Sequence, residues 1–99
     1  MKIGFIGFGK VARNLVRLIN SENITFLTST QNRSENTIKN MEESDVEILD
    51  TFKEVATLSD ILISANSPMF YQADTIIEFN SFYSTANIFI ENQVCTVFW

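Results

Sequence analysis

The chain has 99 residues, of which 45% are hydrophobic and 19% are charged, so it suits one globular domain and is too apolar to be disordered. Its net charge of −5 argues against nucleic acid or an anionic membrane as the main partner. One cysteine and no histidine exclude a disulfide framework, a zinc site and a catalytic histidine within this sequence. We expect a cytoplasmic location, because no apolar stretch approaches the roughly 20 residues that span a bilayer.

Short apolar runs alternate with amphipathic segments through the first two thirds of the sequence. We predict strands at residues 3–6, 24–28, 46–49 and 61–64. We predict helices at residues 10–20, at residues 34–43 and after Thr51. Strands that alternate with helices are typical of a parallel sheet with helices on both faces, so the predicted fold class is α/β.

Each predicted helix carries an apolar face. The first helix is expected to bury Val11, Ala12, Leu15, Leu18 and Ile19. The second is expected to be capped by Ser34 and to bury Ile38 and Met41; the third is expected to bury Phe52, Val55 and Ala56. Thr51 and Glu54 have the spacing of a capping box. In this motif the Thr51 side chain bonds forward to the backbone of Glu54, and the Glu54 side chain reaches back to the backbone of Thr51.

A glycine-rich turn joins the first predicted strand to the first predicted helix. It has the pattern G-x-G-x-x-A and consists of Gly7, Phe8, Gly9, Lys10, Val11 and Ala12. Gly7 permits a tight turn, Gly9 lets a pyrophosphate approach the backbone, and Ala12 lets the helix pack closely on the strand. The N–H groups at the helix start favour an anion. The alternative is a turn that merely needs small residues.

The segment after the second predicted strand bears on the choice of cofactor. An NAD site usually carries an acidic residue there, but no acid occurs from Thr28 until Glu35. The segment offers hydroxyl groups and the guanidinium of Arg33, which suit the 2′-phosphate of NADP. We therefore favour NADP over NAD; the alternative is that Arg33 is a solvated loop residue.

The last third of the sequence has a different composition. Residues 69–99 contain no lysine or arginine but hold five of the nine phenylalanines, both tyrosines and the tryptophan. We predict a helix at residues 69–83 and a fifth strand at residues 86–90, on the edge beside the fourth strand. The apolar end of the chain is expected to be a truncated or frame-shifted tail that leaves Phe89, Phe98 and Trp99 partly exposed and promotes self-association.

Three segments resemble an N-terminal domain shared by several oxidoreductases. They are residues 1–12, Asn32-Arg33-Ser34, and residues 59–65. The domain occurs in 6-phosphogluconate and 3-hydroxyacid dehydrogenases, pyrroline-5-carboxylate reductases and coenzyme F420-dependent NADP reductases. The resemblance covers residues 1–68, which we predict to be a dinucleotide-binding domain of Rossmann type with strand order 3-2-1-4.

The resemblance also implies where a cofactor would bind. It implies contacts to the 2′-phosphate from the loop after the second strand, with Ser29, Thr30, Asn32, Arg33 and Ser34. It implies that the loop containing Ala65, Asn66 and Ser67 lies near the nicotinamide half. In these families a helical C-terminal domain, often dimeric, carries the catalytic lysine, and this chain is expected to lack that domain. A homodimer formed through residues 69–99 is a further expectation.

The predicted function is NADP binding in an oxidoreductase that transfers a hydride to or from nicotinamide. No catalytic residue is identified, and no turnover is expected from this chain alone. The alternatives are a non-catalytic nucleotide-binding module and a non-functional fragment. The sequence leaves open the substrate and whether F420 takes part.

Overall fold

The structure is a computed structural model that describes residues 1–31, 33–64, 85–90 and 93–99. The predicted helix at residues 69–83 therefore lies outside the described residues. Three helices and six strands are described: β1 (Lys2–Ile6), α1 (Lys10–Leu18), β2 (Thr25–Ser29), α2 (Glu35–Glu42), β3 (Glu47–Leu49), α3 (Phe52–Leu58), β4 (Ile61–Ser64), β5 (Thr85–Ile90) and β6 (Gln93–Phe98).

The first four strands form the parallel part of one sheet. Strand β1 lies in the centre and pairs in parallel with β2 on one side and with β4 on the other. Strand β3 pairs in parallel with β2. The predicted order 3-2-1-4 and the α/β Rossmann-type fold are therefore confirmed, and the carboxyl ends of all four strands lie at the same edge of the sheet.

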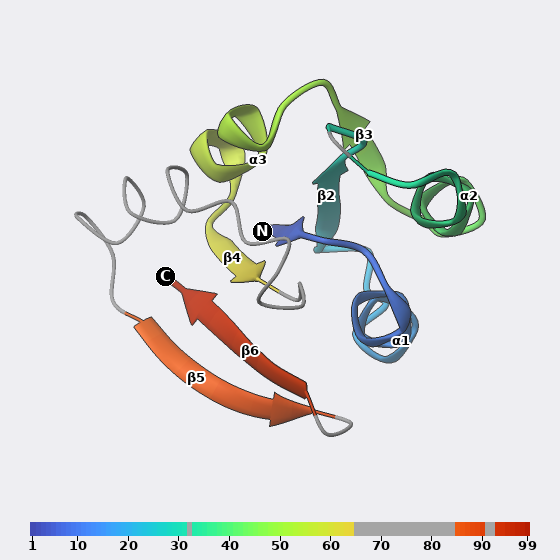
Figure 1. Ribbon diagram of the computed structural model, residues 1–99. Helices are drawn as coiled ribbons and strands as arrows, with labels where there is room; N and C mark the ends of the chain where they lie inside the picture. The colour runs from blue at the N-terminus through green and yellow to red at the C-terminus, as the bar shows by residue number, and fades with distance from the viewer. Residues whose placement is uncertain (32, 65–84, 91–92) are drawn as a thin grey trace.

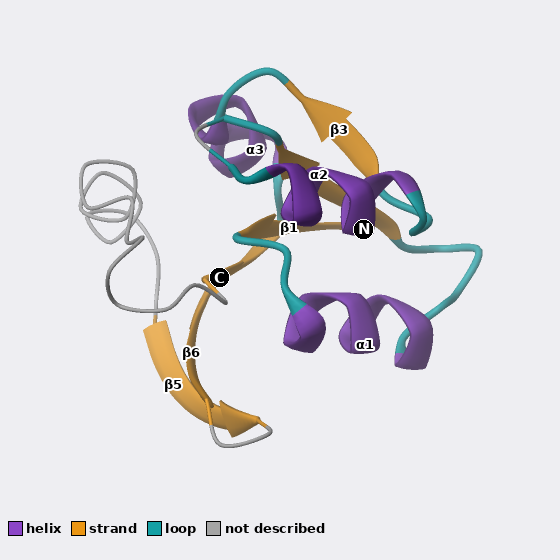
Figure 2. Cartoon of the chain, turned by 45° about the vertical axis from the view of Figure 1, so that its right-hand side comes forward, coloured by secondary structure: helices purple, strands orange, loops and turns teal. Residues whose placement is uncertain are grey.

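The last two strands form an antiparallel hairpin that extends the sheet. The strand order of the whole sheet is β3-β2-β1-β4-β6-β5, so β6 pairs with β4 and β5 lies at the edge. The predicted edge strand at residues 86–90 is confirmed as β5, but its predicted place directly beside the fourth strand was wrong, because β6 lies between them. The final residues, taken as a tail, form the strand that pairs there. Figures 1 and 2 show the hairpin on the side of the sheet away from β3.

Helices cover both faces of the sheet, and each face has its own hydrophobic core (Figure 1). The core beneath α1 and α2 contains three aromatic side chains, Phe5, Phe8 and Phe26, with Phe5 and Phe8 edge to face at 5.7 Å between ring centroids. Met41 of α2 and Cys95 of β6 are fully buried in the same core. Burial raises the pKa of the Cys95 thiol.

The core beneath α3 consists of Ile6, Leu27, Phe52, Val55, Ala56, Leu62 and Phe98. We expected Phe98 to be partly exposed, but it is fully buried because β6 places it under α3. Trp99 follows it and is 51% exposed, as expected. The hairpin therefore contributes to the same cores as the parallel strands.

The helix boundaries follow local signals in the sequence. The Ser34 and Thr51 side chains accept hydrogen bonds from the N–H groups of Thr37 and Glu54, so both predicted N-caps are confirmed. The Glu54 carboxylate accepts a hydrogen bond from the Thr51 hydroxyl at 3.1 Å, so the structure bears out only the Thr51 half of the predicted capping box. The prediction that Leu18 is buried was wrong. Leu18 is 81% exposed, because it lies at the margin of the apolar stripe in the last residue of α1, and Val16 is buried instead.

In the part of the chain that the structure describes, no helix has the length and apolar character needed to span a membrane.

Candidate functional site

The loops that follow β1, β2 and β3 begin at the carboxyl edge of the sheet. Strand β1 ends at Ile6, β2 at Ser29 and β3 at Leu49, and the next residues of the chain leave the sheet there. The strand order reverses between β1 and β4: α1, which follows β1, lies on one face of the sheet, and α3, which precedes β4, lies on the other. Ligands of open α/β sheets bind at such a reversal, outside the carboxyl ends of the strands.

The glycine turn has the backbone that the sequence predicts. Gly7 has φ of 87°, in the left-handed region that glycine adopts without strain. Phe8 is buried, so only its backbone belongs to the turn. Gly9 is exposed, and a Cβ built on it would meet nothing within 4 Å. The structure therefore has open space at Gly9, where the predicted site needs room for a pyrophosphate.

Helix α1 begins at this turn without a side-chain cap. Gly9 is its N-cap and has no side chain to accept a hydrogen bond from the first turn, and none of the described residues of that turn is acidic. The first intrahelical bond is donated by Arg13 to the Gly9 carbonyl, 3.0 Å. The N–H groups of Lys10, Val11 and Ala12 thus have no intrahelical acceptor and carry the positive end of the helix dipole. This end of α1 can accept an anion.

Two of the predicted hydroxyl groups shape the chain around the loop after β2. Ser29 is fully buried, and its Oγ accepts the Gln31 N–H at 3.0 Å. The Ser34 hydroxyl caps α2. Between them, the Arg33 N–H donates to the Thr30 carbonyl at 3.2 Å and closes a turn. Of the other predicted site residues, Asn32, Ala65, Asn66 and Ser67 lie outside the described residues.

Arg33 is half-buried in this loop. Its guanidinium lies over the Phe52 ring, 4.6 Å from the centroid, which is a cation–π arrangement. Its Nε and Nη2 atoms are shielded from solvent, and no described residue accepts a hydrogen bond from them. Burial lowers the pKa of the guanidinium. Buried donors without acceptors are costly, so an anion that reaches Arg33 would gain two charge-assisted bonds.

The start of α3 is attached to the same loop. The Phe52 N–H, at the first residue of the helix, donates to Gln31 Oε1 at 2.9 Å. Sequence reasoning assigned Phe52 only to the core and did not consider Gln31. Their positions in the sequence could have indicated the contact. Gln31 follows β2 and Phe52 follows β3, and the carboxyl ends of these neighbouring parallel strands lie at the same edge of the sheet.

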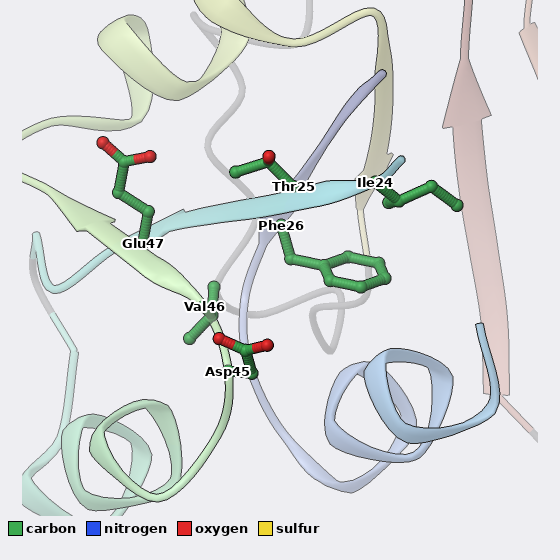
Figure 3. A pocket seen from close by; sticks show the side chains of 6 residues that line it. All are labelled: Ile24, Thr25, Phe26, Asp45, Val46 and Glu47. Carbon is green, nitrogen blue, oxygen red and sulfur yellow. The ribbon is translucent and has the colours of Figure 1, made fainter. Parts of the chain in front are cut away.

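A separate pocket of about 330 Å³ lies at the opposite, amino edge of the sheet (Figure 3). It is lined by Ile24, Thr25, Phe26, Asp45, Val46 and Glu47. Figure 3 shows the Thr25 and Glu47 side chains on one side of the strands and the Phe26 ring on the other. Its charged side chains are the carboxylates of Asp45 and Glu47, which would repel a phosphate. We therefore place the candidate site at the carboxyl edge.

The parallel sheet with its strand-order reversal and the glycine turn at the start of α1 define a Rossmann-type dinucleotide-binding domain. Residues 2–79 match the family described as NADP oxidoreductase, coenzyme F420-dependent, and the chain belongs to this family. The expected N-terminal NADP-binding domain of this oxidoreductase superfamily is thereby confirmed.

Two proteins similar to the chain share only part of their length with it. An uncharacterized 28.5 kDa protein in the 7S RNA 5′ region of Methanothermus fervidus is 38% identical over 68 residues, which are 69% of this chain and 27% of that protein. The solved structure of the conserved protein MTH1747, of unknown function, has 32% sequence identity to this chain and a TM-score of 0.51. The matched region makes up 57% of this chain and 21% of the MTH1747 chain. Its description reports structural similarity with 3-hydroxyacid dehydrogenases. The chain thus spans about a quarter of the relatives it matches.

Proposed function

We propose that this chain binds NADP(H) at the carboxyl edge of the sheet, as the nucleotide-binding part of an oxidoreductase. The observation that carries the proposal is Arg33, whose Nε and Nη2 are buried without a hydrogen-bond partner among the described residues. The 2′-phosphate distinguishes NADP from NAD, and a guanidinium at the end of β2 suits it.

The residues of the glycine turn would hold the pyrophosphate. The open space at Gly9 admits it, the positive φ of Gly7 shapes the turn, and the N–H groups at the start of α1 supply hydrogen bonds. Phe8, Lys10, Val11 and Ala12 contribute through their backbone, since the Phe8, Val11 and Ala12 side chains are buried in the core.

The loop after β2 would hold the 2′-phosphate through Arg33. The family resemblance adds Asn32 and the hydroxyls of Ser29, Thr30 and Ser34 as further partners. A hydroxyl that accepts a backbone N–H can still donate to a phosphate, so burial decides instead: Ser29 is fully buried, whereas Thr30 and Arg33 are partly exposed and are therefore stronger candidates than Ser29. Ala65, Asn66 and Ser67, which follow β4, are proposed to lie toward the nicotinamide, on the resemblance alone.

Nicotinamide supplies the hydride chemistry of such enzymes, and the protein binds and orients it. The residues named above would bind the phosphates of the cofactor and so orient it at the carboxyl edge of the sheet. We assign no general acid or base to them. The substrate and the residues that contact it are proposed to belong to parts of the protein beyond this domain.

Calorimetric titration with NADPH and NADH tests the proposal. We expect tighter binding of NADPH, and we expect Arg33→Ala to weaken NADPH binding by about 1.5–3 kcal/mol, the value of a hydrogen bond to a charged group. NADH binding should change little. Arg17→Ala is the matched control, because Arg17 is exposed in the last turn of α1. Equal affinities for the two cofactors in the unmutated chain would refute the proposal.

A shorter pair of ligands isolates the phosphate contact from the nicotinamide. Adenosine 2′,5′-bisphosphate and adenosine 5′-monophosphate differ only in the 2′-phosphate. The bisphosphate should bind more tightly to the unmutated chain, and Arg33→Ala should remove that difference. A difference that survives the substitution would place the 2′-phosphate elsewhere.

A further inference from the structure

Two contacts connect the loop after β2 to the first residue of α3. The Arg33 guanidinium lies 4.6 Å from the centroid of the Phe52 ring. Two residues earlier in the loop, Gln31 accepts the Phe52 N–H at 2.9 Å. The ring and the backbone of one residue therefore both engage the loop that carries the candidate phosphate-binding side chain.

We infer that Phe52 is a positioning residue, which orients the Arg33 guanidinium for the 2′-phosphate. Gln31 keeps Phe52 in place relative to Arg33. The inference rests on the proposed function, because it concerns how Arg33 is presented to NADP. Phe52 is itself fully buried in the core beneath α3, so its ring is a fixed surface rather than a mobile one. A guanidinium placed on a fixed aromatic surface is restricted before the ligand arrives.

The physical basis is the entropy of a long side chain. A free arginine samples many rotamers, and a phosphate that binds it must order it, at a cost of about two- to tenfold in affinity. The Phe52 ring stabilises one placement in advance while leaving the Nε and Nη2 donors without a partner in the described part of the chain. The arrangement therefore orients the guanidinium without satisfying its donors.

Gln31 aligns the two elements that carry these groups. Its Oε1 satisfies an N–H of the first turn of α3, which lacks an intrahelical acceptor. Its own N–H is bonded to the buried Ser29 oxygen at the end of β2. The end of β2, the loop and the start of α3 thus form a continuous hydrogen-bonded path. A shift of α3 would move the ring relative to Arg33.

The alternative is that Phe52 acts only as a core residue. The ratio of NADPH to NADH affinity distinguishes the two roles, because only a positioning role affects NADPH binding selectively. In the full chain, Phe52→Leu keeps an apolar side chain in the core and removes the aromatic face, and Gln31→Met keeps the length of the side chain and removes the acceptor. Val55→Ala is the matched control, because Val55 is fully buried in the same core one turn later in α3.

We expect Phe52→Leu and Gln31→Met each to weaken NADPH binding about two- to tenfold and to leave NADH binding within twofold. Val55→Ala should lower thermal stability but preserve the ratio of the two affinities. If Phe52→Leu does not fold, Gln31→Met decides, since its side chain is outside the two cores.

An unchanged ratio in the folded variants, or equal losses for both cofactors, would overturn the inference and leave Phe52 with a structural role. Loss of the NADPH preference in Arg33→Ala, measured alongside, would show that the proposed function still stands in that case. Absence of the preference in the unmutated chain would overturn the proposed function and this inference together.

Discussion

Substituting Gly9 by valine tests whether this glycine is needed for folding or for binding the cofactor. Gly9 is exposed, and a Cβ there meets nothing within 4 Å, so the folded chain has room for a larger residue. Its φ of −93° is also accessible to other residues. The cost to stability should be about 1 kcal/mol, because valine is a poorer N-cap than glycine.

The cost to binding should be much larger. The valine side chain would occupy the space that the pyrophosphate needs beside the start of α1, and at least two hydrogen bonds to a charged group would be lost. At about 1.5–3 kcal/mol each, their loss weakens binding by about 3 kcal/mol or more, which is a hundredfold or more. We expect NADPH and NADH to be affected alike, since both carry the pyrophosphate.

Titration calorimetry and urea unfolding on the same sample measure the two effects. Gly7→Ala is the informative comparison, because φ of 87° at Gly7 makes that substitution destabilise the fold by about 1–2 kcal/mol through backbone strain. A Gly9→Val protein that binds NADPH with unchanged affinity would show that the glycine turn is not the phosphate site. A protein that no longer folds would show that the space at Gly9 is not open.

Three further predictions concern stability and are read from urea unfolding. Gly4→Ala should destabilise the chain by at least 2 kcal/mol, because an added Cβ would collide with the buried Ser59 Oγ under α3; an unchanged midpoint would mean that α3 can move aside. Phe98→Ala should cost about 3–5 kcal/mol, since the ring is fully buried; a loss below 1 kcal/mol would show that the hairpin does not complete the core. Thr51→Ala should cost about 1 kcal/mol through the lost cap at the Glu54 N–H, and Thr51→Ser should restore most of it.

The parallel half of the fold could be predicted because its signals are local. The run Ile61–Ser64 is short, begins with three apolar residues after Asp60, and its predicted and observed limits agree. The caps at Ser34 and Thr51 mark the starts of α2 and α3 in the sequence itself. Once strands and helices alternate, the handedness of the connections leaves few possible orders for the sheet.

The hairpin could not be placed in the same way. Cys95 and Val97 face the core beneath α1 while Phe98 faces the core beneath α3, so this end of β6 has apolar residues on both faces and reads as an unpatterned apolar tail. Its position beside β4 depends on pairing between Ser64 and Thr96 and between Leu62 and Phe98, which are far apart in the sequence. Nothing local distinguishes that arrangement from a strand added at the edge.

The candidate site was predictable in part for the same reason. The glycine turn has a sequence pattern, and the positive φ of Gly7 agrees with it. The placement of Arg33 over Phe52 has no such pattern, because it depends on how the loop after β2 meets the start of α3. Composition suggested a phosphate-binding arginine, but only the structure shows its donors without partners among the described residues.

The location of the nucleotide is the central claim, and mapping of amide chemical shifts tests it most directly. In a titration of the labelled chain with NADPH, the largest changes should fall at residues 7–12 and 29–34, on the carboxyl edge of the sheet. Titration with NADH should reproduce the changes at 7–12 and reduce those at 29–34. Changes concentrated instead at Ile24–Phe26 and Asp45–Glu47, around the pocket on the amino edge, would contradict the account.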